Sequence, residues 1–130
     1  MTTHKGSCHC GAVQIEVDLE LIGKATQCNC TICTKLASTG ATVKPGALRL
    51  LKGEDSLSTY SVNPVATRYF CKTCGVHVFS RGDIPEIGGA FAGVRINVLD
   101  DLDLGTLQIS YWDGRHNNWQ AGTRERPWPV

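Results

Sequence analysis

Cysteine is the residue type whose spacing in this chain most directly indicates chemistry. Seven cysteines occur in 130 residues, and none of them stands alone. They lie in three short segments, Cys8-His9-Cys10, Cys28-Asn29-Cys30-Thr31-Ile32-Cys33 and Cys71-Lys72-Thr73-Cys74. Close-spaced cysteines in a chain without a secretion signal are typical of metal ligands. Four thiolates complete a structural zinc site, whereas three leave one coordination position open for water or a substrate.

The first and third segments supply four cysteines that we expect to share one zinc ion. Each segment is a short loop with two thiolates, and two such loops can place four sulfur atoms tetrahedrally, roughly 2.3 Å from the metal. Gly75 follows the third segment directly and can adopt the positive φ that such a tight turn needs. The alternatives are disulfide bonds or redox chemistry, which the lack of a secretion signal disfavours.

The middle segment supplies three thiolates within six residues, Cys28, Cys30 and Cys33. If this segment binds a second zinc ion, the fourth position is open. Three thiolates make zinc a weak Lewis acid that is poorly suited to activating water. The same zinc is well suited to binding a substrate thiol, because a thiol that coordinates a metal loses its proton. In the alternative interpretation a protein group is the fourth ligand, and this zinc is purely structural.

The other candidate binding residues are two arginines and a histidine. Residues 113–119 combine a turn, a cation, a titratable ring and amides, so this segment could close over an anionic ligand. Arg115 and His116 are its candidate contacts. Arg68 is a third candidate, because a guanidinium can bind a carboxylate with two hydrogen bonds. The alternatives are a solvated loop and ordinary surface ion pairs.

These groups must be positioned by a fold that is mainly β. Fourteen glycines and many short alternating segments indicate short strands with little helix. We expect a hairpin between a strand over 12–17 and one that ends at Cys28, which would bring the first two cysteine segments together. Residues 31–36 can form a helical turn that directs backbone N–H groups at the thiolates. Further strands are expected over 40–43, 47–51, 57–62, 67–71, 76–80, 90–99 and 107–112, with a loop over 81–89 and an irregular tail from residue 113.

Size and charge limit the classes of protein to which this chain can belong. We expect residues 1–130 to form a single domain, with a core over about 4–112 and a tail over 113–130. Only nine residues are aromatic, so bound zinc is expected to contribute to folding. Thirteen basic and 12 acidic residues are spread along the chain, which argues against nucleic-acid binding. No signal peptide, polybasic segment or membrane-length apolar run is present, so we expect a cytoplasmic protein with reduced thiols.

The combined cysteine pattern resembles the glutathione-dependent formaldehyde-activating enzyme family, which includes the domain of centromere protein V. The resemblance runs from about Gly6 to Leu104, and residues 113–116 also resemble small bacterial members. The segments that carry it are Gly6-Ser7-Cys8-His9-Cys10-Gly11, Cys28-Asn29-Cys30-Thr31-Ile32-Cys33, Tyr60, Arg68-Tyr69-Phe70-Cys71-Lys72-Thr73-Cys74-Gly75 and Asn97-Val98-Leu99-Asp100.

The resemblance implies a β-tent zinc fold and a carbon–sulfur lyase activity with glutathione as the thiol, such as the formation of S-hydroxymethylglutathione. It also implies that Cys8, Cys10, Cys71 and Cys74 hold a structural zinc, and that Cys28, Cys30 and Cys33 hold a second, active zinc. The second zinc has three ligands and should be held less tightly. Asn29 stands where the family commonly has histidine, and we expect this change to leave metal binding intact. The alternatives are a zinc-stabilised binding module without turnover, and a protein with one zinc and three idle cysteines.

Overall fold

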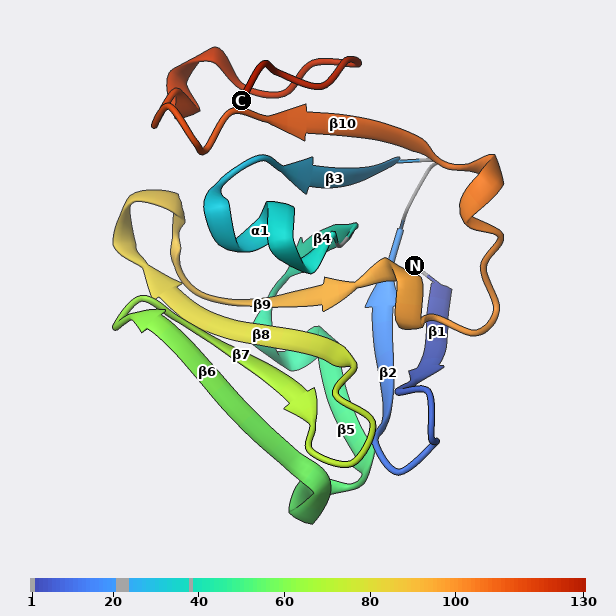
Figure 1. Ribbon diagram of the computed structural model, residues 1–130. Coiled ribbons are helices and arrows are strands. Elements are labelled where there is room, and N and C mark those ends of the chain that lie inside the picture. The colour runs from blue at the N-terminus through green and yellow to red at the C-terminus, as the bar shows by residue number, and fades with distance from the viewer. Residues whose placement is uncertain (1, 21–23, 38) are drawn as a thin grey trace.

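The computed structural model describes residues 2–20, 24–37 and 39–130, and within them ten strands form two sheets (Figure 1). The strands are β1 (Thr2–Ser7), β2 (Gln14–Leu19), β3 (Lys24–Cys28), β4 (Gly40–Val43), β5 (Leu48–Lys52), β6 (Leu57–Asn63), β7 (Ala66–Cys71), β8 (His77–Ile84), β9 (Gly89–Arg95) and β10 (Gln108–Trp112). The one α-helix of the described residues is α1 (Thr31–Leu36). Short 3-10 turns are η1 (Pro45–Ala47), η2 (Glu54–Ser56), η3 (Pro85–Ile87), η4 (Ile96–Val98), η5 (Leu104–Thr106) and η6 (Trp119–Ala121).

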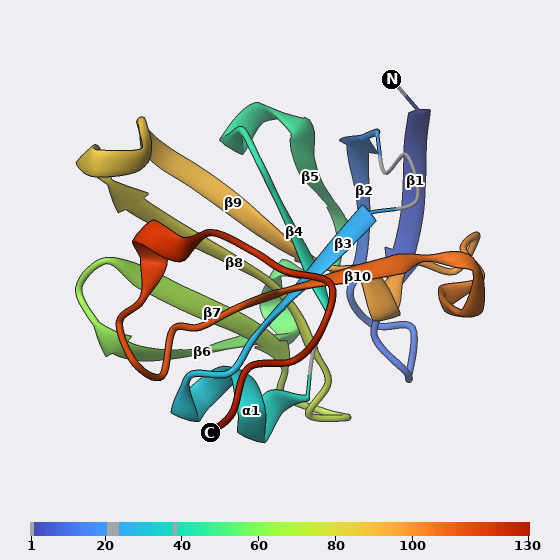
Figure 2. The ribbon, with the colours of Figure 1, turned by 90° about the horizontal axis from the view of Figure 1, so that it is seen from above.

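The two sheets differ in size and are built mostly from antiparallel pairs. The smaller sheet has the order β1-β2-β5, and the larger has the order β10-β3-β4-β9-β8-β7-β6. One pair is parallel, since β10 runs beside β3 with Trp112 opposite Cys28. Strand β10 is therefore the edge strand that leads the C-terminal tail back toward the end of β3 and toward α1, as the view from above shows (Figure 2).

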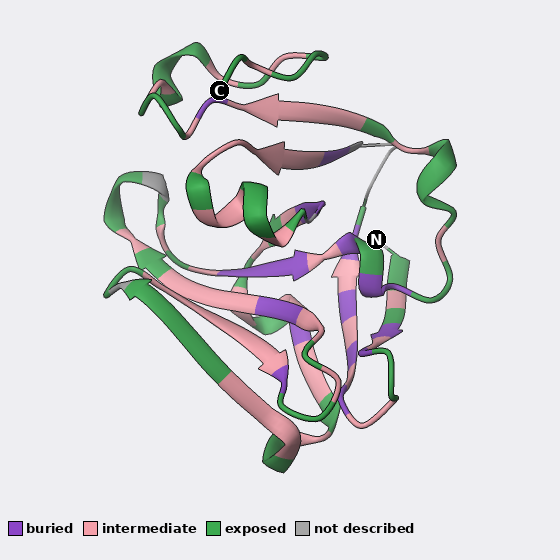
Figure 3. Cartoon of the chain, viewed as in Figure 1, coloured by how far each residue is buried: buried purple, intermediate pink, exposed green. Residues whose placement is uncertain are grey.

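The hydrophobic core lies where the smaller sheet packs against the larger one. Alternate residues of β2 point into this core, with Ile15 and Val17 completely buried. Buried residues also gather on β8 and β9 (Figure 3), where Val78 and Val94 have no exposed surface. Because successive side chains of a strand point to opposite faces, the alternation of apolar and polar residues along β2 buries one face of the strand and leaves the other partly exposed.

The mainly β prediction is confirmed, and so is the short helix over 31–36. The predicted hairpin between the strand over 12–17 and the strand ending at Cys28 is wrong. Strand β2 pairs with β1 and β5, whereas β3 pairs with β4 and β10. Part of the connection between these two strands lies outside the described residues, since 21–23 are not among them. The first two cysteine segments consequently belong to different sheets.

The predicted boundaries of two later strands are also wrong. Strand β8 continues to Ile84, so half of the loop expected over 81–89 is strand. Strand β9 ends at Arg95, and the chain then turns through η4 with Ile96 and Val98 both buried. Strand β1 was not predicted, because its sequence lacks apolar alternation and its position depends on pairing with β2. No helix of the described residues is long and apolar enough to cross a membrane.

Candidate metal centres and the adjacent pocket

The structure gathers the seven cysteines into two separate clusters. Four form the first, which we call the four-cysteine cluster, and three form the second, the three-cysteine cluster. Within each cluster all the sulfur atoms lie within 4.8 Å of one another. The members of the four-cysteine cluster are Cys8, Cys10, Cys71 and Cys74, and those of the three-cysteine cluster are Cys28, Cys30 and Cys33.

The four-cysteine cluster has the spacing of a tetrahedral zinc site. Its sulfur atoms are separated by 3.6 Å between Cys8 and Cys10 and by 3.7 Å between Cys10 and Cys71. Four sulfur atoms placed about 2.3 Å from one zinc ion would lie roughly 3.8 Å apart. The pair in the β1–β2 connection therefore fits a zinc ion shared with Cys71, the last residue of β7, and Cys74 in the turn after it.

Tight turns present these four thiols. Gly11 and Gly75 follow the two cysteine pairs with φ of 79° and 77°, which favours glycine at both places. The N–H of Gly75 donates to the carbonyl of Cys71 at 2.7 Å and closes the second turn. Backbone N–H groups also face the sulfur atoms, and those of Cys10 and Val76 lower the pKa of the Cys74 thiol to about 6. A low pKa favours the thiolate, which is the form that binds metal.

The three-cysteine cluster is built where β3 ends and α1 begins. Cys28 is the last residue of β3, Cys30 is the N-cap of α1, and Cys33 lies in the first turn of that helix. The N–H of Cys30 donates to the sulfur of Cys28 at 3.4 Å. All three side chains are half-buried, so they remain accessible from one side. Among the described residues, no histidine, carboxylate or fourth cysteine joins this cluster.

The three thiols share their protons unequally. A hydrogen bond from Cys33, assisted by the N–H of Cys30, lowers the pKa of the Cys28 thiol to about 5. The same hydrogen bond, followed by burial, raises the pKa of Cys33 far above its ordinary value. Cys28 is thus a thiolate near neutral pH without metal, and Cys33 is its hydrogen-bond donor. This donor set of thiols suits zinc, which binds cysteine sulfur readily.

A partly buried cation lies beside the three-cysteine cluster. Burial lowers the pKa of the Arg95 guanidinium, while the charge of Cys33 acts in the opposite direction. The guanidinium lies over two glycines, because a Cβ at Gly40 would come within 2.6 Å of its Nη2 atom and one at Gly93 within 3.3 Å. Its position depends on β4 and β9 being neighbours, which no local pattern reveals.

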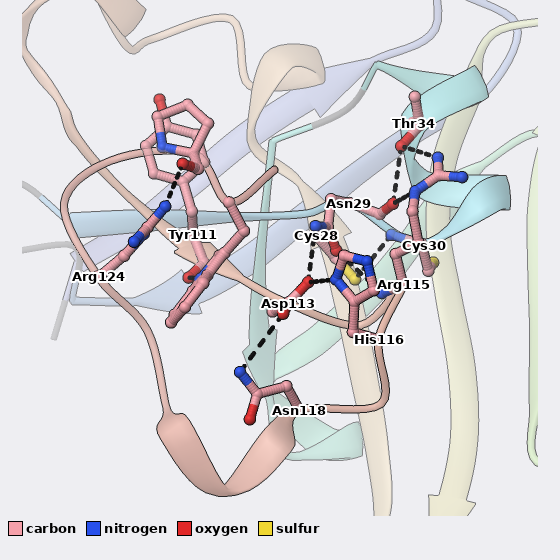
Figure 4. A network of polar contacts seen from close by, with 12 residues as sticks. Cys28, Asn29, Cys30, Thr34, Tyr111, Asp113, Arg115, His116, Asn118 and Arg124 are labelled. Atoms are coloured by element: carbon pink, nitrogen blue, oxygen red, sulfur yellow. Dashed lines mark hydrogen bonds and ion pairs between the residues drawn. The ribbon is translucent and has the colours of Figure 1, made fainter. Parts of the chain in front are cut away.

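A polar network attaches the start of the C-terminal tail to the segment over 28–34, which we call the cysteine loop (Figure 4). The buried carboxylate of Asp113 accepts hydrogen bonds from Asn29 Nδ2 at 2.9 Å and His116 Nδ1 at 2.8 Å. Asn29 Oδ1 in turn accepts from the backbone N–H of Arg115 at 2.9 Å. The hydrogen bond from Asn29, followed by that from His116, lowers the pKa of Asp113. Asn29 thus joins the tail to the three-cysteine cluster without being a metal ligand itself.

Gly114 brings this network into contact with a cysteine. Its backbone lies so close to Cys28 that a Cβ would come within 2.5 Å of the sulfur and 2.7 Å of the Trp119 ring. The Gly114 backbone also helps to lower the pKa of Cys28. The sequence singled out the segment over 113–119 but assigned no role to Asp113 or Gly114. The signal in the sequence from which these roles could have been inferred is the acidic residue and the glycine that directly precede Arg115.

Two of the predicted substrate-binding residues lie in different environments. Arg115 donates from Nε to the carbonyl of Asn29 at 3.0 Å and from Nη2 to Thr34 Oγ1 at 3.3 Å. Arg115 therefore braces the cysteine loop, and it lies next to the three-cysteine cluster. Arg68 is half-buried on β7, and its charge acts on Arg95. Arg68 thus lies close enough to Arg95 for the two charges to interact.

A pocket of about 380 Å³ adjoins the three-cysteine cluster. Cys28 and Cys33 form part of its lining, and Tyr111, Trp112 and Trp128 contribute aromatic walls. The first two aromatics come from β10, and the third comes from the tail. Sequence reasoning missed this pocket, because its walls meet only through the parallel pairing of β10 with β3.

Comparison with known proteins finds similar sequences and a similar structure. Residues 3–115 match the family model described as glutathione-dependent formaldehyde-activating enzyme. A protein of Penicillium rubens and one of Emericella nidulans, each named "Putative glutathione-dependent formaldehyde-activating enzyme", are 33% and 29% identical to this chain over 97 and 119 residues. These matches cover 69% and 88% of this chain but 51% and 54% of the two relatives. The chain therefore spans about half the length of the curated relatives it matches.

The similarity extends to a solved structure. A crystal structure of a Rhodobacter sphaeroides protein matches with a TM-score of 0.68 and 29% sequence identity. The match covers 96% of this chain and 99% of that one. The arrangement of strands described above is thus shared by a protein of the same size.

Proposed function

The chain belongs to the glutathione-dependent formaldehyde-activating enzyme family, and we propose that it is a zinc-dependent carbon–sulfur lyase. Its substrates in this proposal are glutathione, or a related thiol, and an aldehyde, with S-hydroxymethylglutathione as the product when the aldehyde is formaldehyde. The thiol sulfur bonds to the carbonyl carbon, the π electrons of the carbonyl move to oxygen, and the thiol proton ends on that oxygen. The reverse reaction breaks the carbon–sulfur bond.

The observation that supports this proposal is the incomplete ligand set of the three-cysteine cluster. Three thiols converge there, and no further histidine, carboxylate or cysteine of the described residues joins them. A structural zinc site has four protein ligands, whereas a catalytic one has three and an open position. Zinc held by Cys28, Cys30 and Cys33 would lower the pKa of a thiol in that open position, so that the substrate sulfur is a nucleophile at neutral pH.

The residues around the three-cysteine cluster would hold and orient the reactants. The cation of Arg95 beside Cys33 balances the negative charge of the thiolates. Asp113 accepts from His116 Nδ1, which leaves Nε2 of the same ring able to exchange a proton with the carbonyl oxygen. Arg115, next to this histidine, can attract a carboxylate of the peptide thiol. The proposal requires reduced cysteines, and therefore a reducing compartment such as the cytoplasm.

Thiol binding to the metal-loaded chain tests the proposal. The protein is loaded with Co²⁺ in place of zinc, because the visible spectrum of cobalt reports a change of its ligands. Glutathione is then titrated while the spectrum and the heat of binding are recorded. We expect saturable binding with a spectral change, and loss of both in Cys33→Ala. A full chain that binds two metal ions but no glutathione would contradict the lyase proposal and favour a zinc-stabilised binding module.

A further inference from the structure

We propose that the pocket beside the three-cysteine cluster binds an apolar group carried by the carbon atom next to the substrate sulfur. The substrates would then include adducts of thiols with aromatic or branched aliphatic aldehydes, and formaldehyde would not be the best of them. This inference rests on one assumption of the proposed function, namely that the substrate sulfur lies at the open position of the three-cysteine cluster.

The location of the pocket ties it to the reacting carbon. Two of the three clustered cysteines, Cys28 and Cys33, line the pocket directly. A sulfur atom placed among the three thiols therefore has its neighbouring carbon at the pocket mouth. In a hemithioacetal that carbon also carries the side chain of the aldehyde. The side chain is thus the part of the adduct that can enter the pocket.

The chemistry of the walls selects an apolar occupant. Tyr111, Trp112, Pro127 and Trp128 line the pocket, and most of its surface is apolar, although Gln27, Asn29 and Thr34 also border it. Among the described residues, no carboxylate, ammonium, guanidinium or imidazole side chain lines it. The carboxylates and the ammonium group of glutathione would lose their hydration there without a charged partner, which is costly. An aromatic or aliphatic group would instead gain from leaving water, by roughly 25 cal/mol for each Å² of apolar surface buried.

The size of the pocket also excludes formaldehyde as a matching occupant. Its volume is about 380 Å³, whereas a cavity of about 150 Å³ is enough to bind benzene. A formaldehyde adduct carries only a hydrogen atom where a larger aldehyde carries its side chain. That hydrogen would leave the pocket to water, whereas a phenyl or branched alkyl group would displace this water and contact the rings.

The tail that closes the pocket is held in place by its own contacts. Trp128 donates from Nε1 to the carbonyl of Tyr111 at 2.8 Å. The Arg124 guanidinium stacks over the Trp128 ring at 3.9 Å, and Arg124 also pairs with Tyr111 through two backbone hydrogen bonds of 2.8 and 3.1 Å. The wall is therefore preorganised, and little conformational freedom is lost when a ligand binds.

A separate pocket can accept the charged part of the thiol. It borders Cys30, has a volume of about 470 Å³ and is lined by Thr31, Ile32, Lys35, Tyr60 and Val62, so that Lys35 is the one cation in an otherwise mostly apolar lining of described residues. The ammonium group of Lys35 is a partner for a carboxylate that the pocket beside Cys28 lacks. The peptide portion of glutathione and the side chain of the aldehyde would thus leave the three-cysteine cluster in different directions.

The experiment compares two thiols of similar acidity that differ in the group next to sulfur. Benzyl mercaptan carries a phenyl ring on the carbon bonded to sulfur, and 2-mercaptoethanol carries a small polar group there. Both are titrated calorimetrically into the zinc-loaded full chain. We expect benzyl mercaptan to bind at least tenfold more tightly. In Trp128→Ala this preference should fall about tenfold, with the affinity for 2-mercaptoethanol unchanged.

Control variants separate a lost wall from a damaged fold. Trp128→Phe keeps an aromatic wall without the hydrogen bond to Tyr111, and we expect it to retain most of the preference. Leu51→Ala removes an exposed apolar side chain of β5 and should change neither affinity. Circular dichroism and the melting temperature check that each variant is folded. Equal affinities of the two thiols for the parent protein would overturn the inference and leave the proposed function standing. Binding of neither thiol would overturn the proposed function and this inference with it.

Discussion

At the scale of single residues, the two cysteine clusters differ in how many of the four ligands of a zinc ion they supply. The four-cysteine cluster already contains the four ligands of a structural zinc site. The three-cysteine cluster contains a thiolate at Cys28, a donor at Cys33 and a cation nearby at Arg95. Removing one thiol from each cluster should therefore have different consequences for the protein.

Metal content is the first measurement that separates the clusters. We expect two zinc ions in the parent chain, one in Cys33→Ala, and an unfolded protein for Cys10→Ala. The reason is that only the four-cysteine cluster joins distant parts of the chain. Native mass spectrometry counts the zinc ions, and circular dichroism reports the fold. Finding two zinc ions in Cys33→Ala, or a folded Cys10→Ala protein, would show that the roles are assigned incorrectly.

The pH dependence of alkylation tests the shared proton. Because the pKa of Cys28 is lowered to about 5 from 9.0, its thiolate fraction rises as pH increases through 5 and is nearly complete at pH 7. In protein that has lost only the zinc of the three-cysteine cluster, the iodoacetamide rate at Cys28 should therefore level off above about pH 6, whereas the rate of an ordinary thiol, with a pKa of about 8.5, is still rising at pH 8.5.

Variants at Cys33 provide the control for this profile. Cys33→Ser keeps a hydrogen-bond donor to Cys28, so the midpoint of the Cys28 profile should stay low. Cys33→Ala removes the donor, and the midpoint should move upward toward an ordinary thiol pKa. Peptide mass spectrometry follows the alkylation of Cys28 by itself. An unchanged midpoint in Cys33→Ala would mean that the backbone N–H groups lower the pKa by themselves.

At the scale of elements, the start of the C-terminal tail acts as a brace for the end of β3 and the start of α1. Asn29 contacts both Asp113 and the backbone of Arg115. The helix α1 has six residues and no side-chain cap at its N-terminus. So short a helix is marginal by itself, because helix nucleation is unfavourable. The brace therefore contributes to holding the three-cysteine cluster in shape.

Gly114→Ala tests the brace, with Gly46→Ala as its matched control. A Cβ at Gly114 would come within 2.5 Å of the Cys28 sulfur, whereas a Cβ at Gly46 would meet nothing within 4 Å. Overpacking of this kind costs roughly 1–3 kcal/mol, and displacement of the tail should weaken thiol binding about tenfold. Gly46→Ala should change neither quantity. Urea unfolding and thiol titration measure both effects, and equal behaviour of the two variants would argue against the brace.

At the scale of the whole molecule, the four-cysteine cluster joins the two sheets. Cys10 and Cys71 are 61 residues apart in sequence, yet their sulfur atoms lie 3.7 Å apart. Two of its cysteines directly follow β1 of the smaller sheet, and the other two lie at the end of β7 of the larger sheet and in the turn after it. Binding of structural zinc is worth about 10–16 kcal/mol in small peptides, and a typical domain is stable by only about 5–15 kcal/mol. Loss of this zinc is therefore comparable to the whole stability of the fold.

Stepwise chelation tests this arrangement. We expect the zinc of the three-cysteine cluster to leave first, without a change in far-ultraviolet circular dichroism. The second zinc should leave together with the unfolding of residues 1–130, which we propose form one cooperative domain. A zinc indicator and circular dichroism are followed during the same titration with a chelator. Release of both zinc ions before any unfolding would contradict a structural role for the four-cysteine cluster.

Much of the fold and of the metal centres could be predicted because the relevant signals are local. The spacing of the cysteines indicated metal ligands, since two thiols within a few residues necessarily lie close together. The residues of β2 alternate between apolar and polar, and β2 does bury its apolar face. The segment over 31–36 is helical as expected, because it is short and contains neither glycine nor proline.

What only the tertiary structure decided are the contacts between segments that are distant in sequence. The sequence predicted that Cys8 and Cys10 share a zinc ion with Cys71 and Cys74, and the strand pairing brings these thiols together, away from Cys28, which the predicted hairpin would have placed near them. The tertiary structure also placed Arg95 close enough to Cys33 for their charges to interact, through the pairing of β4 with β9. The parallel pairing of β10 with β3 brought Trp128 and Tyr111 to the pocket beside the three-cysteine cluster. The sequence by itself therefore predicts that the seven cysteines are metal ligands. Their division between the sheets, and the apolar pocket beside three of them, depend on strand pairing, because side chains tens of residues apart meet only after the sheets have formed.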